Sequence, residues 1–132
     1  MSGPDSSAPE ELAAFEGGRV DPASFTHAEH IRIGFEMLAR HPFGETISRF
    51  SAGLRRLAAN AGKPEIYHET ITVAFLALIN ERRVSAAARD WLEFKAKNAD
   101  LMDKRCLEKW YAPEELGSDL ARATFCLPHA KL

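Results

Sequence analysis

Three histidines in two segments are the residues of this chain whose types and spacing could support chemistry. His27 and His30 are three positions apart in the sequence His-Ala-Glu-His, and on a helix this spacing places two side chains at neighbouring positions of one face. His68 supplies a third imidazole from a second segment. A catalytic zinc or copper ion commonly has three protein ligands and an open position for water or substrate. We therefore predict that His27, His30 and His68 bind a divalent transition metal, either zinc, copper or iron.

Four further residues are candidates for contacts with a ligand near this site. Glu65 and Thr72 lie three positions before and four positions after His68, so on a continuous helix they would share its face and could orient its ring. Tyr67 combines an apolar ring with a polar hydroxyl, which suits the wall of a pocket. Arg122 could bind an anionic group.

Two functions of different classes are consistent with these residues. In the first, the metal activates water or dioxygen at its open position, and the protein is a small metal-dependent enzyme acting on a small molecule. In the second, the protein is a non-enzymatic module, either binding a small ligand or accessory to another protein, and its metal-free histidines exchange protons with the ligand. A third interpretation leaves the histidines as polar contacts within a packed bundle. The sequence leaves open whether the protein is an enzyme.

Other catalytic motifs are missing from the sequence. It contains no His-Glu-x-x-His, since the histidine pair is one residue too close, and no phosphate-binding loop, dinucleotide-binding glycine pattern, nucleophile elbow or calcium loop. Cys106 and Cys126 have neither zinc-ribbon nor Cys-x-x-Cys spacing. We interpret both as reduced core residues of a cytoplasmic protein, which agrees with an N-terminus that lacks the features of a secretory signal.

Length and composition indicate one globular domain. The 132 residues are 45% hydrophobic, enough for a core without disulfide or metal support. The net charge is −2, and the 17 basic and 19 acidic side chains are mixed along the chain. This pattern predicts binding to neither nucleic acid nor membrane, and no apolar run approaches the roughly 20 residues that span a bilayer. We expect a disordered leader at residues 1–8 and a single helical domain at 9–132.

Capping residues and apolar spacing predict the elements that would position these side chains. Thr26 and Glu29 form a capping box, His41-Pro42 ends the helix that follows, and no hairpin pattern is present. The predicted helices cover 9–15, 26–40, 43–60, 63–83, 86–96, 101–111 and 118–125, with a single turn at 113–116.

The fourth of these helices contains the longest apolar run. Between residues 71 and 79 only Thr72 interrupts it, and a helix that is apolar on every side is normally buried on every side. The predicted fold is thus an all-α, compact single-domain bundle of five to six helices around a buried central helix. A homodimer in which a partner covers part of this helix is an alternative. Gly34, one turn after His30, leaves room for a ligand or for a close helix contact.

Three motifs give the chain a family resemblance. They are F-x-H-x-x-H-x-R at residues 25–32, Y-H-E-T-x-T at 67–72 and L-x-S-x-x-A-R-x-x-F at 116–125. In these motifs the chain resembles a family of small, largely uncharacterised bacterial proteins, over most of residues 20–128. The resemblance implies no established activity. It draws attention to the residues that the motifs contain: His27, His30, Arg32, Tyr67, His68, Glu69, Thr70, Ser118 and Arg122. The family pattern continues with a proline and an acidic residue, whereas this chain has Pro128 and His129.

Overall fold

Helices account for all regular structure in residues 7–86 and 88–129, the part of the chain that this computed structural model describes. This confirms the predicted all-α class. The α-helices are α1 (Ala8–Glu16), α2 (His27–Arg40), α3 (Phe43–Asn60), α4 (Glu69–Ala86), α5 (Trp91–Lys97), α6 (Pro113–Leu116) and α7 (Asp119–Ala123). Four 3₁₀ helices join them: η1 (Pro22–Ser24), η2 (Pro64–Ile66), η3 (Ala99–Met102) and η4 (Lys104–Lys109). Most of the expected leader, residues 1–8, lies outside the described residues, and Ala8 already belongs to α1.

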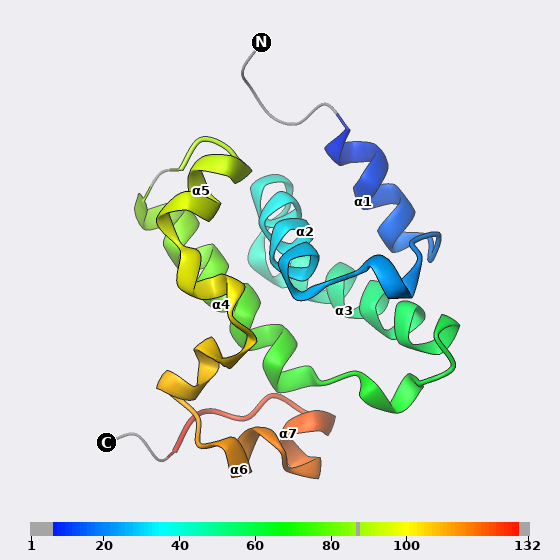
Figure 1. Cartoon of the computed structure of the whole chain (residues 1–132), viewed down its shortest axis with the longest axis vertical. Helices are drawn as coiled ribbons and strands as arrows, with labels where there is room; N and C mark the ends of the chain where they lie inside the picture. The colour runs from blue at the N-terminus through cyan, green and yellow to red at the C-terminus, as the bar shows by residue number, and fades with distance from the viewer. Residues whose placement is uncertain (1–6, 87, 130–132) are drawn as a thin grey trace.

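The most continuously buried helix is α2, and Figure 1 shows it in the middle of the molecule. It packs against α1, α3, α4, α5 and η3, and every residue from 33 to 38 is buried. Gly34 permits the closest of these contacts, because a Cβ atom there would lie 3.1 Å from Leu76 and 3.2 Å from Ile79 of α4. Of the two roles predicted for Gly34, the structure therefore supports the close helix contact.

The predicted enclosure of the 71–79 helix is not confirmed. Ala77 of α4 is exposed, and Ile71, Val73 and Leu78 are only half-buried. The neighbours of α4, mainly α2, α3, α7 and η4, cover only part of its circumference. An apolar run therefore did not locate the centre of the bundle.

The beginning of α4 also differs from the prediction. The chain forms η2, passes through extended backbone at Tyr67 (φ −61°, ψ 139°), and enters α4 at Glu69. His68 is the residue before the helix, and its Nδ1 accepts a hydrogen bond from the backbone N–H of Ile71 at 3.1 Å. A side chain that satisfies such an unpaired donor begins a helix at the following residue. Glu65 lies in η2 and consequently shares no helix with His68. Thr72 lies one turn after His68, with its backbone N–H donating to the His68 carbonyl at 3.1 Å.

Two other predicted helices have different boundaries in the structure. The helix predicted at 86–96 begins at Trp91, where the Asp90 side chain accepts from the N–H of Glu93 at 2.9 Å. The segment 101–111 forms η3 and η4 in place of one α-helix. Asp103 separates them by accepting from the N–H of Arg105 at 2.9 Å. A second capping residue therefore interrupts what the apolar spacing predicted as continuous.

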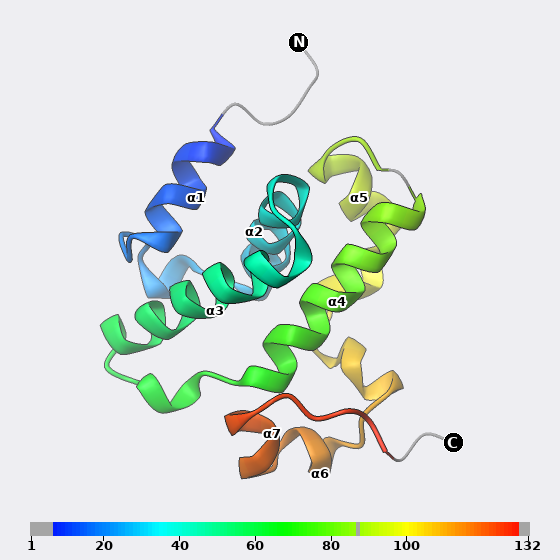
Figure 2. The same cartoon turned by 180° about the vertical axis from the view of Figure 1, so that it is seen from behind.

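The C-terminal segment closes over the start of α4, as Figure 2 shows from behind. The hydroxyl of Thr70 donates to the carbonyl of Thr124 at 2.8 Å and accepts from the N–H of Cys126 at 3.0 Å. Tyr111 donates to the carbonyl of Cys126 at 2.6 Å. These bonds fix an irregular strip of chain against the helix. Within the described ranges, no helix is both long and apolar enough to cross a membrane.

Candidate functional site

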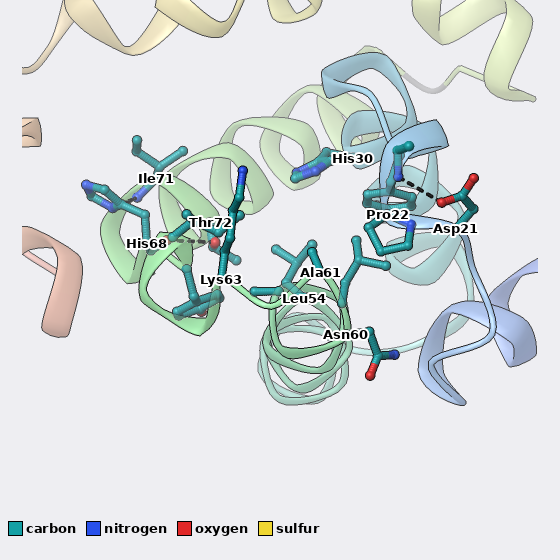
Figure 3. Close-up of a pocket in the computed structure, with 16 residues that line it drawn as sticks. Asp21, Pro22, His30, Leu54, Asn60, Ala61, Lys63, His68, Ile71 and Thr72 are labelled. Atoms are coloured by element: carbon teal, nitrogen blue, oxygen red, sulfur yellow. Dashed lines mark hydrogen bonds between the residues drawn. The ribbon is translucent and has the colours of Figure 1, made fainter.

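A cavity of about 750 Å³ lies among η1, the start of α2, the end of α3, η2 and the start of α4 (Figure 3). Its volume is within the range of small-molecule sites. Exposed residues mark its open side, among them Asp21, Asn60, Ala61 and Lys63. The cavity is therefore a candidate functional site that solvent can reach.

The inner wall of this cavity is mainly apolar. Leu54, Leu57 and Ala58 line it from α3, at spacings that form one stripe along a helix. Ile71 contributes from α4 and Phe25 from the segment before α2. Phe25 has a rigid support, because its ring stacks on Phe15 with centroids 5.3 Å apart. This wall offers apolar surface to a ligand.

His30 is a polar residue of the cavity lining that contacts the apolar wall. Its ring centroid lies 4.6 Å from that of Phe25, and its ring nitrogens have no hydrogen-bond partner among residues 7–86 and 88–129. Burial, and to a lesser degree the neighbouring His27, lower the pKa of His30 to about 4. The ring is therefore neutral at pH 7, and it offers one donor and one acceptor to the cavity.

His68 lies at the edge of the same cavity, but both of its ring nitrogens are engaged. Nε2 lies 2.6 Å from the carbonyl oxygen of Leu116, and a carbonyl oxygen only accepts, so Nε2 carries the proton. Nδ1 accepts from Ile71. Figure 3 places the His68 ring well apart from His30. His68 thus joins α4 to the segment before α7.

His27 faces another part of the core. Its Nε2 donates to the carbonyl of Leu101 at 2.9 Å, and its ring meets Phe75 edge-on with centroids 4.9 Å apart. The centroids of the His27 and His30 rings are 6.4 Å apart. Spacing put both residues on one side of α2, but it did not determine where their rings point.

The predicted metal-binding function is wrong. Among the described residues, no group of three or more His, Cys, Asp or Glu side chains could hold a metal ion. The physical reason is that backbone carbonyls occupy Nε2 of both His27 and His68, which leaves His30 as the one of these three histidines without a hydrogen-bonded ring among the described residues. The site is a cavity with one free imidazole.

The other predicted ligand contacts divide into two groups. Tyr67 and Thr72 line the cavity. The Tyr67 hydroxyl donates to Glu69, the Arg55 guanidinium lies 4.2 Å from its ring centroid, and burial together with Glu69 raises the pKa of Tyr67 to about 12. Thr72 donates to the carbonyl of His68 at 2.8 Å.

Glu65 and Arg122 lie outside the lining of the cavity. They meet each other, because Arg122 donates to the backbone carbonyls of Glu65 and Ile66 at 3.5 and 3.4 Å. Arg122 thus holds η2 against α7. Its predicted contact with a ligand finds no support in this arrangement.

Sequence reasoning missed two kinds of lining residue. Leu54, Leu57 and Ala58 of α3 line the cavity but are not among the predicted ligand contacts, because an apolar side chain looks the same in sequence whether it faces another side chain or a cavity. Lys63 was treated only as a helix start. Lys63 follows Gly62, whose φ of +75° turns the chain after α3. This turn is the only local feature of the sequence that sets Lys63 apart from a helix start.

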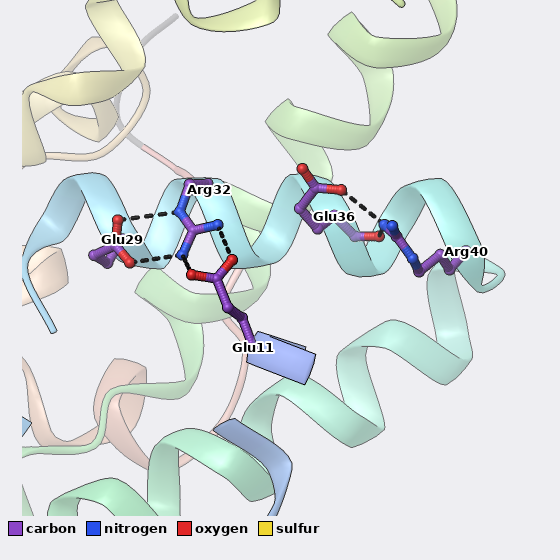
Figure 4. Close-up of polar contacts among 5 residues, drawn as sticks. All are labelled: Glu11, Glu29, Arg32, Glu36 and Arg40. Atoms are coloured by element: carbon purple, nitrogen blue, oxygen red, sulfur yellow. Dashed lines mark hydrogen bonds and ion pairs between the residues drawn. The ribbon is translucent and has the colours of Figure 1, made fainter. Parts of the chain in front are cut away.

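Arg32, which the family resemblance marks, is fully paired. It donates to Glu11 at 2.7 and 3.1 Å and to Glu29 at 3.1 and 2.8 Å (Figure 4). Figure 4 also shows the pair of Arg40 with the buried Glu36, at 2.7 Å. Bidentate contacts of a guanidinium with carboxylates are strong and directional. Arg32 therefore fastens α1 to α2.

No protein-family model, no curated protein and no solved structure matches this chain. The resemblance to the bacterial family thus stays a prediction.

Proposed function

We propose that this protein binds a small, mainly apolar molecule in the cavity between α2, α3 and α4. One observation carries the proposal: the cavity has an apolar wall, and it is also lined by the neutral imidazole of His30, whose ring nitrogens have no hydrogen-bond partner in the described part of the chain. Sites for small molecules commonly combine apolar walls with a few polar groups that orient the ligand.

The apolar wall supplies the affinity. A ligand that removes about 200 Å² of apolar surface from water gains about 5 kcal/mol, at roughly 25 cal/mol per Å². The loss of ligand freedom offsets part of this gain. A cavity whose wall is already formed reduces that cost, and the stacking of Phe25 on Phe15 holds one side in place.

His30 supplies the orientation. A neutral ring can donate one hydrogen bond and accept another. A ligand that leaves His30 unpaired in the filled cavity would bind more weakly, because an unmatched buried polar group costs about 1–3 kcal/mol. We therefore expect the ligand to place one polar atom beside His30 and apolar groups against α3.

Blocking the cavity with a bulky side chain tests this proposal. Ala61→Trp would fill the open side from the exposed end of α3, and Ala59→Trp is the matched control, since Ala59 is also exposed but does not line the cavity. The neutral probe N-phenyl-1-naphthylamine should gain fluorescence with wild type and with Ala59→Trp. It should lose at least ten-fold in affinity with Ala61→Trp.

The controls are circular dichroism and thermal unfolding, which should show that both variants are folded. Equal binding of the probe by Ala61→Trp and Ala59→Trp would contradict the proposal that the cavity is the binding site. The same conclusion would follow if the wild-type protein did not bind the probe.

A further inference from the structure

We propose that the molecule bound in the cavity is an organic acid whose ionised carboxylate pairs with Lys63 while its apolar part lies against α3. This inference rests on the proposed function and adds the charge class of the ligand. Its starting point is the set of charged residues that line the cavity, Asp21 and Lys63.

Lys63 is the charged lining residue without a partner. Its side chain forms no ion pair or hydrogen bond with the described part of the chain. Three arginines of α3 and α7 differ from Lys63 in this respect. Arg55 lies over Tyr67, Arg56 donates to the carbonyl of Glu16, and Arg122 donates to η2. An isolated ammonium group at the mouth of an apolar cavity favours a ligand with negative charge.

The Asp21 carboxylate would repel an anionic group, and its position therefore orients the ligand. Its carboxylate accepts from the N–H of Ala23 at 3.0 Å and from the hydroxyl of Ser24 at 3.4 Å, so it is committed to the η1 turn. Figure 3 shows Asp21 on one side of the cavity and Lys63 on the other, with His30 between them in this view. The carboxylate would therefore lie at the Lys63 end, away from Asp21.

His30 and Lys63 together suit a carboxylate. A carboxylate has two oxygens that only accept hydrogen bonds, and these two side chains provide an imidazole N–H and an ammonium group. Because Lys63 is the single uncommitted cation of the lining among residues 7–86 and 88–129, a head group with one negative charge is matched, whereas a doubly charged phosphate would keep an unpaired charge. The apolar part can then extend along Leu54 and Leu57 toward Phe25.

Three probes with the same ten-carbon tail test this inference: decanoate, decanol and decylamine. Each would displace N-phenyl-1-naphthylamine at pH 7.5, below its micelle concentration or, for decanol, below its solubility limit. With wild type, decanoate should displace the probe at a concentration at least five-fold lower than decanol, and decylamine should be weakest. Raising the sodium chloride concentration should weaken decanoate alone, because salt screens an exposed ion pair.

Lys63→Gln gives the decisive comparison. It should bring decanoate to the level of decanol and leave decanol unchanged, while Lys104→Gln, which alters net charge equally at an exposed lysine outside the cavity, should change neither. Equal affinity of decanoate and decanol in wild type would overturn the carboxylate inference and leave the apolar site standing. An equal loss of both probes in Lys63→Gln would do the same. If no probe is displaced, the proposed function itself fails.

Discussion

At the scale of single residues, the three central histidines differ in what their ring nitrogens contact. His27 and His68 bond to backbone carbonyls far away in the sequence, at Leu101 and Leu116. His30 faces a cavity instead. The same side chain thus fastens two segments in two cases and remains free for a ligand in the third.

The double contact of His68 predicts a measurable effect on stability. His68→Ala removes both the cap of α4 and the bond to Leu116, and should lower the free energy of unfolding by about 2–3 kcal/mol. His68→Asn keeps an acceptor suited to a helix start, so it should lose less. Urea unfolding at pH 7.5 measures the difference. Equal stability of His68→Ala and wild type would contradict the fastening role.

His30 predicts a pH dependence whose sign follows from its lowered pKa. The folded protein binds a proton at His30 with a pKa of about 4, whereas the unfolded chain does so near its ordinary value of about 6.5. The unfolded state therefore takes up the proton first as pH falls, and stability decreases between about pH 6.5 and 4. The full effect corresponds to about 3 kcal/mol.

His30→Gln isolates this contribution, because glutamine does not titrate in this range. Urea midpoints at several values between pH 7.5 and 4 should fall more steeply for wild type than for the variant. Parallel curves would show that His30 is not kept neutral by the fold.

At the scale of elements, α1 depends on an aromatic contact and an ionic one. Phe15 packs on α3 where Gly53 has no side chain, and it also supports Phe25 at the cavity. Arg32 of α2 binds Glu11 of α1. The helix therefore contributes to the site without lining it.

Gly53→Ala should separate α1 from α3. The new Cβ would lie 2.3 Å from the Phe15 ring, so the ring must move, at a cost of about 1–3 kcal/mol. Gly44→Ala in the same helix meets nothing within 4 Å, and it should be neutral or stabilising by up to about 1 kcal/mol. Thermal unfolding and binding of N-phenyl-1-naphthylamine should both weaken for the first variant only. A Gly53→Ala protein as stable as Gly44→Ala would refute this packing.

Helix starts that depend on nearby residues could be predicted from the sequence, whereas those that depend on distant residues could not. Thr26 and Ser118 accept from the backbone N–H groups three residues on, so the starts of α2 and α7 follow from nearby residues. The start of α4 depends on the imidazole of His68, whose orientation involves a carbonyl 48 positions away. The cavity was predictable only in part for the same reason. His30, Tyr67 and Thr72 are among the predicted site residues, but the apolar α3 wall that completes the cavity with them is not. The predicted metal centre failed because helical spacing fixes neighbouring positions and not ring directions.

At the scale of the whole molecule, the cavity and the C-terminal segment are connected through the start of α4, which both of them contact. Every lining residue lies between positions 21 and 72. Yet one wall, at the start of α4, is held from behind by Leu116, Thr124 and Cys126. Changes in this segment should therefore affect the cavity without touching a ligand.

The hold of the C-terminal segment on α4 has a consequence for synthesis. During translation, residues 1–72 emerge from the ribosome well before residues 116–126. The whole cavity wall therefore leaves the exit tunnel before the carbonyls that accept from His68 and Thr70. The growing chain would thus expose Leu54, Leu57 and Ile71 around an incompletely supported helix start. Until residues 116–126 have emerged, the pocket would therefore be looser than the one in the finished protein.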